Sequence, residues 1–109
     1  MKKSTINFEI ELDEQQIPDK MLWSASDSGM VGPKPCKATM IGVWDAVEGT
    51  TMRIDLWSKD MFVEDMKLFF YENLASMADT YERATNDKTM AEEMRNFSKH
   101  FGKKAGILK

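Results

Sequence analysis

TTMRIDLWSKDMFVEDMKLFFYENLASMADTYERA, residues Thr50 to Ala84, is the stretch that decides the fold of this chain. Apolar and polar residues alternate from Met52 to Trp57, which predicts a half-buried strand. After a polar corner at residues 58–60, apolar residues recur every three or four positions from Val63 to Tyr81, the spacing of one face of a helix. The change of period therefore predicts a layered structure of sheet and helix.

Three further strands are predicted before this stretch. Residues 4–13 alternate cleanly, residues 20–26 follow a turn, and residues 36–45 form the third strand. Residues 27–35 contain two Gly and two Pro and are predicted to be a loop. Because the connections are too short for a crossover, neighbouring strands are expected to be antiparallel.

A second helix is predicted from Met90 to Phe101, where apolar residues again recur at steps of three and four. Thr89 and Glu92 fit a capping box, in which each side chain bonds the backbone N–H of the other residue. Gly102 is predicted to end this helix, as glycine commonly does.

Four strands followed by two helices predict an α+β domain. The strands are expected to form one antiparallel meander, β-β-β-β-α-α, with both helices packed on one face of the sheet. A single domain is expected over residues 1–109, with residues 103–109 as a frayed basic tail. This order of elements resembles the SecB export chaperone, as a fold analogy only.

Composition and charge disfavour several classes of protein. No apolar run approaches the roughly 20 residues that span a bilayer, and no signal peptide is recognised. With the single Cys36 excluding an intramolecular disulfide, we expect a cytoplasmic protein. Acidic residues dominate residues 1–87, which argues against nucleic acid as a partner. The basic residues of 88–109 are expected to complement a helix dipole, with contact to a membrane surface as the weaker alternative.

The residues that commonly carry chemistry do not form a recognisable site. One His and one Cys leave no metal-binding pattern, and the glycines of residues 29–32 lack a phosphate-binding spacing. Cys36 is predicted to be an inert buried thiol, and His100 a partial cation near a helix end. Arg53 and Asp55 are expected to join a cross-strand ladder of ion pairs. We therefore expect no enzyme activity, no metal and no cofactor.

Two sets of apolar residues are candidate contact residues. Ile41, Val43 and Trp57 are predicted on the outer face of the sheet, where an apolar patch indicates a protein or oligomer interface. The second set is predicted to fill the core, with an apolar ligand pocket as the alternative. It consists of Trp23, Trp44, Phe70 and Phe97.

Several segments, taken together in order, resemble the gliding motility-associated proteins of the GldC family. They cover most of the chain, and none is a catalytic signature. One departure is Phe62, at a position where the family tends to carry Thr, so a side-chain cap for the long helix is lost. The segments are FEIELDE (Phe8–Glu14), IPDKMLWSASDSG (Ile17–Gly29), CKA (Cys36–Ala38), RIDLW (Arg53–Trp57), VEDMK and FFY within Val63–Tyr71, MADTYERAT (Met77–Thr85) and MAEEMRNFSKHFG (Met90–Gly102).

This resemblance implies a non-enzymatic accessory protein of the bacterial gliding and type IX secretion machinery. Its partners would be protein components of that apparatus, bound through the outer sheet face, which could also form a homo-oligomer. Two alternatives stay open. One is a SecB-like export chaperone that binds unfolded clients, for which the ten Met residues would be suited. The other is a binder of small apolar ligands.

Overall fold

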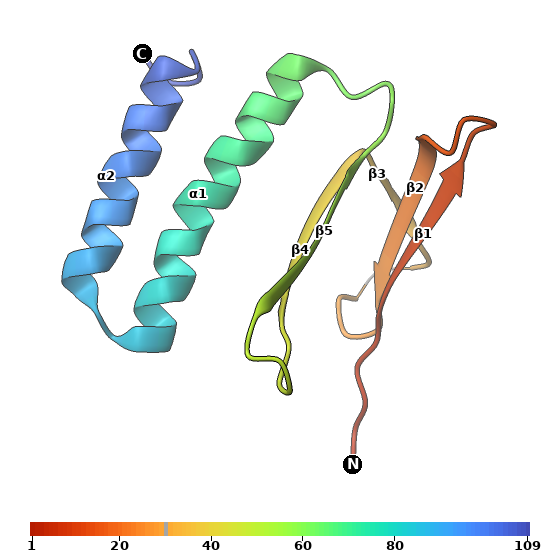
Figure 1. The fold of residues 1–109 in the computed structure, drawn as a ribbon, viewed down its shortest axis with the longest axis horizontal. Helices are drawn as coiled ribbons and strands as arrows, with labels where there is room; N and C mark the ends of the chain where they lie inside the picture. Colours follow the sequence, from red (N-terminus) through yellow and green to blue (C-terminus); the bar gives the residue numbers. More distant parts are fainter. Residues whose placement is uncertain (30) are drawn as a thin grey trace. The chain divides into compact units, whose positions relative to one another are not determined.

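The structure is a computed structural model that describes residues 1–29 and 31–109. The chain divides into two compact units, residues 1–61 and residues 62–109, and each is described by itself. All strands lie in the first unit and both helices in the second (Figure 1). The α+β class is thereby confirmed. The packing of both helices on one sheet face stays a prediction.

The described residues of the first unit form five antiparallel strands in two sheets. The three-stranded sheet has the order β1-β2-β3, and the second sheet is a two-stranded hairpin, β4-β5, which we call the β4–β5 ribbon. In the second unit two helices follow one another. The elements are β1 (Ile6–Leu12), β2 (Pro18–Ala25), β3 (Lys34–Cys36), β4 (Ala38–Trp44), β5 (Thr51–Trp57), α1 (Val63–Thr85) and α2 (Lys88–Lys104).

The single four-stranded meander that the sequence predicts is not confirmed, because the predicted third strand is divided by a bend at Lys37. Residues Lys34–Cys36, mostly within the predicted loop, pair with β2, whereas Ala38–Trp44 pair with β5. The Lys37 carbonyl accepts the N–H of Ser58 at 2.8 Å, and the Lys37 ammonium lies 3.0 Å from Asp60. These contacts tie the bend to the end of β5, so the chain leaves one sheet and enters the other.

The buried part of the strand unit is small. Met21 on β2 is only 2% exposed, and it lies opposite Cys36 on β3, which is half-buried. Thr39 and Ser58 are the buried polar residues of this unit among those described. The Ser58 hydroxyl donates to the Asp60 carboxylate at 2.7 Å, so it is satisfied although it is buried.

Helix α1 begins at Val63, as the apolar period predicts. Its N-cap is Phe62, which makes no side-chain hydrogen bond, in agreement with the loss of a capping hydroxyl there. Glu64 and Asp65 in the first turn compensate in part, because carboxylates are favoured at the positive end of the helix dipole. At the other end Asn86 adopts a left-handed conformation, and its N–H reaches the Glu82 carbonyl.

Helix α2 begins two residues before the predicted position, because Asp87 and not Thr89 is its N-cap. The Asp87 carboxylate accepts the N–H of Met90 at 3.1 Å. The predicted capping box is therefore wrong. Asp and Thr are both good N-cap residues. Asp87 follows Asn86 directly and so lies beside the first free backbone N–H groups of α2, where it takes the capping position.

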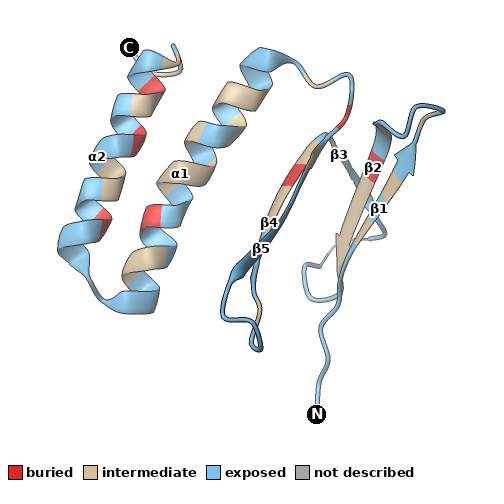
Figure 2. Cartoon of the chain, viewed as in Figure 1, coloured by how far each residue is buried: buried red, intermediate tan, exposed pale blue. Residues whose placement is uncertain are grey.

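The two helices form a hairpin whose contact is lined by small residues. Ala78 on α1 and Ala91, Ser98 and Gly102 on α2 are all buried (Figure 2). Small side chains allow the two backbones to approach closely. At the edge of this contact, the Arg95 guanidinium of α2 bonds three carboxylates at 2.9 to 3.1 Å, those of Asp79, Glu82 and Glu92.

Gly102 lies inside α2 and does not end it, which contradicts the prediction. A Cβ at this position would lie 2.8 Å from the Leu108 Cδ1 and from the Tyr71 Cε1 atoms. The helix ends instead before Gly106, whose φ of +81° needs glycine. The chain then folds back, and the N–H groups of Ile107 and Leu108 both donate to the Gly102 carbonyl, at 2.8 and 3.0 Å. Glycine is therefore required at position 102 by the close packing of Leu108 and Tyr71, and not by a turn.

We predict that Gly102→Val lowers the free energy of unfolding by about 2 kcal/mol, since overpacking a filled contact costs about 1 to 3 kcal/mol. Urea unfolding followed by circular dichroism measures this. The matched control is Lys103→Val, the same new side chain at the exposed neighbouring position, where a change within about 0.5 kcal/mol is expected. Equal losses in both variants would contradict the close packing of Leu108 and Tyr71 on Gly102.

Candidate interaction surface

The hairpin turn sets which residues of the β4–β5 ribbon share a face. The Asp45 N–H donates to the Thr50 carbonyl at 2.9 Å, and the Asp45 carboxylate accepts the N–H groups of Val47 and Glu48. Gly49 has a φ of +66°, a left-handed conformation that glycine adopts without steric strain. With this closure Ile41 lies opposite Ile54, and Val43 opposite Met52.

One face of the ribbon is consequently apolar, and we call it the aliphatic face. Residues paired across two antiparallel strands point to the same side of the sheet. The aliphatic face carries no charged residue. Its members are Thr39, Ile41, Val43, Met52, Ile54 and Leu56.

The other side of the ribbon, the tryptophan face, combines aromatic and charged side chains. Trp57 lies opposite Ala38, and Trp44 lies opposite Thr51. The two Trp side chains are strongly exposed, Trp44 at 68% and Trp57 at 56%. The predicted interface is therefore divided, because Ile41 and Val43 lie on the aliphatic face and Trp57 on the opposite one. Alternation within each strand was correct, but the parity between strands depends on the register of the hairpin.

The tryptophan face also carries an ion pair, which lies within β5 between the positions of Trp44 and Trp57. The Arg53 guanidinium bonds the Asp55 carboxylate twice, at 2.7 and 3.0 Å, and this contact raises the pKa of Arg53 above its ordinary value. One Arg53 nitrogen would lie 3.3 Å from a Cβ at Gly42, so the guanidinium lies over the glycine opposite it. The expected ladder of ion pairs across strands is replaced by this pair within β5.

A shallow groove of about 240 Å³ adjoins the end of β5. Lys59 lies at the rim of this groove and connects its two sides. Its backbone N–H donates to the Pro18 carbonyl at 3.0 Å, and its ammonium lies 3.2 Å from the Asp13 carboxylate. The Asp13 carboxylate also accepts the N–H groups of Gln15 and Ile17. These bonds lower the pKa of Asp13, the bond from Ile17 most of all. The groove is lined by Ile17, Pro18, Asp55, Leu56, Trp57 and Lys59.

The four residues predicted to form a core or an apolar pocket have different surroundings. Trp23 is half-buried on β2 opposite Phe8. Trp44 is exposed on the ribbon, and Phe70 on α1 is 40% exposed. Phe97 lines a groove of about 260 Å³ between the two helices, which contains none of the other three.

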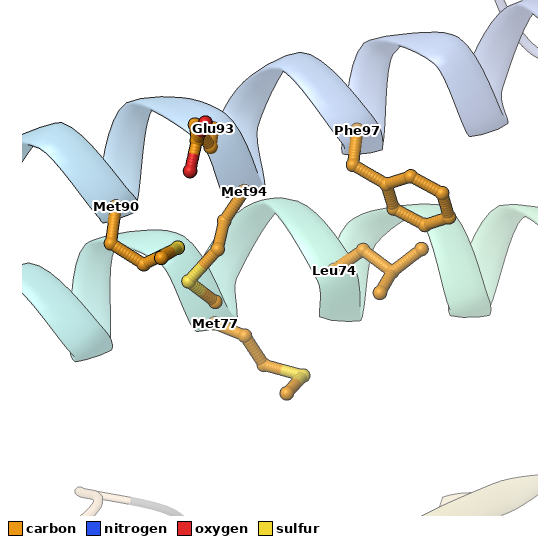
Figure 3. A pocket seen from close by; sticks show the side chains of 6 residues that line it. All are labelled: Leu74, Met77, Met90, Glu93, Met94 and Phe97. Atoms are coloured by element: carbon orange, nitrogen blue, oxygen red, sulfur yellow. The ribbon is translucent and has the colours of Figure 1, made fainter.

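The groove of the helical hairpin is rich in methionine. Figure 3 shows Met90, Met94 and Phe97 reaching from α2 beside Leu74 and Met77 of α1. Glu93 is the one charged residue among those that line it. Thioether side chains are flexible and polarisable, so such a groove adapts to apolar surfaces of differing shape.

Few groups in the described part of the chain are placed for covalent or metal chemistry. Burial raises the pKa of the Cys36 thiol, so the reactive thiolate is disfavoured, as expected for an inert cysteine. His100 is exposed and contacts the ring of Phe97, with 6.3 Å between ring centroids. Across the described residues there is no cluster of three or more His, Cys, Asp or Glu side chains that could bind a metal ion.

Sequence reasoning missed two features of the surface. Trp44 is predicted to lie in the core, yet its side chain is exposed. The pairing of Arg53 with Asp55 was also missed. Their spacing of two residues on one face is the signal that could have indicated it.

The described residues define a small α+β protein made of a strand unit and a helical hairpin. The family model described as "Gliding motility-associated protein GldC-like" matches residues 18–107. The chain therefore belongs to the GldC-like family, and the resemblance read from the sequence is confirmed. Neither the curated proteins nor the solved structures yielded a match. The described helices include none with the length and apolar character that a membrane span requires.

We predict that the stability of the strand unit declines as pH falls below about 4, in part through Asp13. A carboxylate with a lowered pKa in the folded state stabilises that state above its unfolded pKa, and this contribution is lost as pH falls through the folded pKa. In Asp13→Asn this part of the pH dependence should disappear. Urea midpoints measured between pH 2 and 7 test it. Glu14→Gln, at the exposed neighbouring carboxylate, should keep the wild-type profile, and an unchanged profile in Asp13→Asn would contradict the assignment.

Proposed function

We propose that this protein is a non-enzymatic accessory component of the gliding motility and type IX secretion machinery, acting in the cytoplasm by binding other proteins. Membership of the GldC-like family supports the association with gliding motility. The half-buried single Cys36 suits a reducing compartment. The binding mode is supported by the tryptophan face of the β4–β5 ribbon, which is the observation that carries the proposal.

The composition of the tryptophan face distinguishes it from the aliphatic face. A surface without any charge, such as the aliphatic face, has the character of a protein's own core. The tryptophan face instead exposes Trp44 and Trp57 on either side of the Arg53–Asp55 pair. Trp and Arg are enriched among the few residues that provide most of the binding energy in protein interfaces. We therefore assign the contact with a machinery protein to the tryptophan face, with Trp57 retained from the predicted interface.

The shallow groove at the end of β5 extends this surface. Trp57 lines it together with Ile17 and Pro18, and the ammonium of Lys59 lies at its rim. An apolar side chain of a partner can enter beside Trp57, and the ammonium of Lys59, paired with Asp13 and Asp19, keeps the rim polar. Such a combination of aromatic anchor and polar rim is typical of protein interfaces.

We expect Trp57→Ala and Trp44→Ala each to reduce the recovery of a crosslinked partner from native cells by tenfold or more. Truncating one central anchor commonly costs 2 kcal/mol or more of binding free energy, which is roughly a thirtyfold loss of affinity. Gliding speed should fall in parallel. The readouts are quantitative mass spectrometry of the crosslinked complex and colony spreading.

Val47→Ala is the matched control for these variants. Val47 is an exposed apolar residue of the same hairpin, but it lies in the turn and outside both faces. It should leave recovery and gliding unchanged. If both Trp variants fold normally and also behave like wild type, the tryptophan face is not the binding surface.

A second candidate function, binding of unfolded client proteins, is favoured by the methionine-rich groove of the helical hairpin. The groove exposes Met77, Met90 and Phe97 and has one charge on its rim. Flexible apolar side chains suit segments of varied sequence. A likeness to SecB itself is not confirmed, so this candidate rests on the groove alone.

We expect Phe97→Gln to weaken the suppression of aggregation, if the groove binds clients. Light scattering of a chemically unfolded secretory substrate, diluted into buffer with the purified protein, measures this. Lys99→Gln, an exposed substitution on the same helix, is the control and should behave like wild type. Absence of suppression by the wild-type protein at a tenfold excess would exclude this function.

A further inference from the structure

The outer edge of β5 is a free strand edge of defined length. Hydrogen bonds in an antiparallel pair alternate, so only every second residue bonds the partner strand. The Asp45 N–H bonds Thr50, and the Ser58 N–H bonds Lys37, which fixes the even-numbered residues of β5 as those bonded to β4. The odd-numbered residues of β5 direct their N–H and C=O groups outward, and among the described residues β5 pairs only with β4. Lys59 already donates to Pro18, so this free edge ends at Trp57.

The order of residues along this edge is complementary to itself. If a second β5 runs antiparallel beside the first, with a two-fold axis at Ile54, Arg53 lies opposite Asp55 of the partner subunit. Thr51 then lies opposite Trp57, and Met52 opposite Leu56 of the partner subunit. All outward-directed residues meet outward-directed residues in this register, so the backbone groups of both edges can bond each other.

The charges favour this register over its neighbours. Arg53 and Asp55 already form an ion pair within one strand, and they share a face. In the symmetric pair, Arg53 lies beside Asp55 of its own strand and opposite Asp55 of the partner subunit, so every neighbouring charge on this face has the opposite sign. Opposite charges facing each other across strands stabilise a pair, and like charges destabilise it. A shift of the register by two residues would remove the cross-strand contact.

The ribbon also benefits energetically from further strands. A sheet of two strands is marginally stable by itself in water, whereas three or more strands with an apolar face are stable. Ile54 is 55% exposed in the ribbon, and Val43 is 52% exposed. Two ribbons joined at β5 would form a four-stranded sheet in which the aliphatic faces are continuous.

We propose that two copies of this chain pair through the outer edges of β5, in antiparallel register about Ile54, to form a symmetric homodimer. The occupant of the edge is a second copy because the charge pattern has two-fold symmetry about Ile54. In an antiparallel pair, Arg53 of each chain faces Asp55 of the partner subunit. This self-association concerns the strand edge and does not depend on the tryptophan face binding another protein.

Charge reversal tests the register, with sedimentation velocity as the readout over a range of protein concentrations. Wild type should form dimers as concentration rises. Arg53→Asp should be monomeric because it places Asp opposite Asp55, and Asp55→Arg should be monomeric because it places Arg opposite Arg53. A mixture of the two single variants should form a heterodimer, since each strand then carries one sign and faces the opposite sign throughout.

The mixing experiment separates recognition from loss of structure. Each single variant also breaks the ion pair within its own strand, but only pairing between the two chains restores a dimer on mixing. A monomeric wild type at all concentrations, or single variants that dimerise as well as wild type, would overturn the proposal. So would a mixture of folded variants that stays monomeric.

Disulfide trapping tests the position of the two-fold axis. Ile54 faces itself there in a pair without hydrogen bonds, whose Cα atoms lie about 4.5 Å apart, within the range for a disulfide. In a Cys36→Ser background, Ile54→Cys should form a covalent dimer under mild oxidation. The control is Val43→Cys, on the same face with similar exposure but on β4, which should remain monomeric. Equal crosslinking of the two variants, or none by Ile54→Cys, would contradict this register.

Discussion

The register of the β4–β5 ribbon is the constraint on which the surface of this protein depends. It is fixed by the Asp45 turn, where one carboxylate holds two backbone N–H groups and Gly49 supplies the left-handed φ. A slip of one residue in a strand moves every side chain to the opposite face. The same register decides which face of the ribbon is aliphatic, where Trp57 points, and which backbone groups of β5 stay unpaired.

Much of the fold can be predicted from the sequence, because the spacing of apolar residues indicates both the type of element and the face that it buries. The start of α1 at Val63 and the antiparallel order of the strands could be predicted in this way. The bend at Lys37 could not, since it depends on Ser58 and Asp60, more than 20 residues away in the chain. The role of Gly102 was also hidden, because glycine at a helix end and glycine under a packed Leu108 look alike in sequence.

Only part of the candidate interaction surface could be predicted from the sequence, because it too depends on contacts between distant residues. Alternation assigns faces within one strand, and it did so correctly for Ile41 with Val43 and for Trp57 with Arg53. Relating the faces of two strands needs the number of residues in the hairpin connection and the identity of the residue that closes it. Asp45 closes the hairpin with Thr50, and this pairing places Trp57 opposite Ala38. No pattern within either strand contains that information.

The Arg53–Asp55 pair shows how charges that discourage non-specific pairing at a strand edge can also select one particular partner strand. Exposed edges of sheets invite pairing with other chains, and proteins commonly discourage this with charged residues. Two charges of like sign would repel any second copy of the same strand. Charges of opposite sign, spaced two residues apart around a central Ile54, attract a copy in one antiparallel register, and like charges face each other when that register shifts by two residues. A charge pattern with a two-fold centre therefore restricts the edge to one partner, and it does so without requiring a large apolar contact.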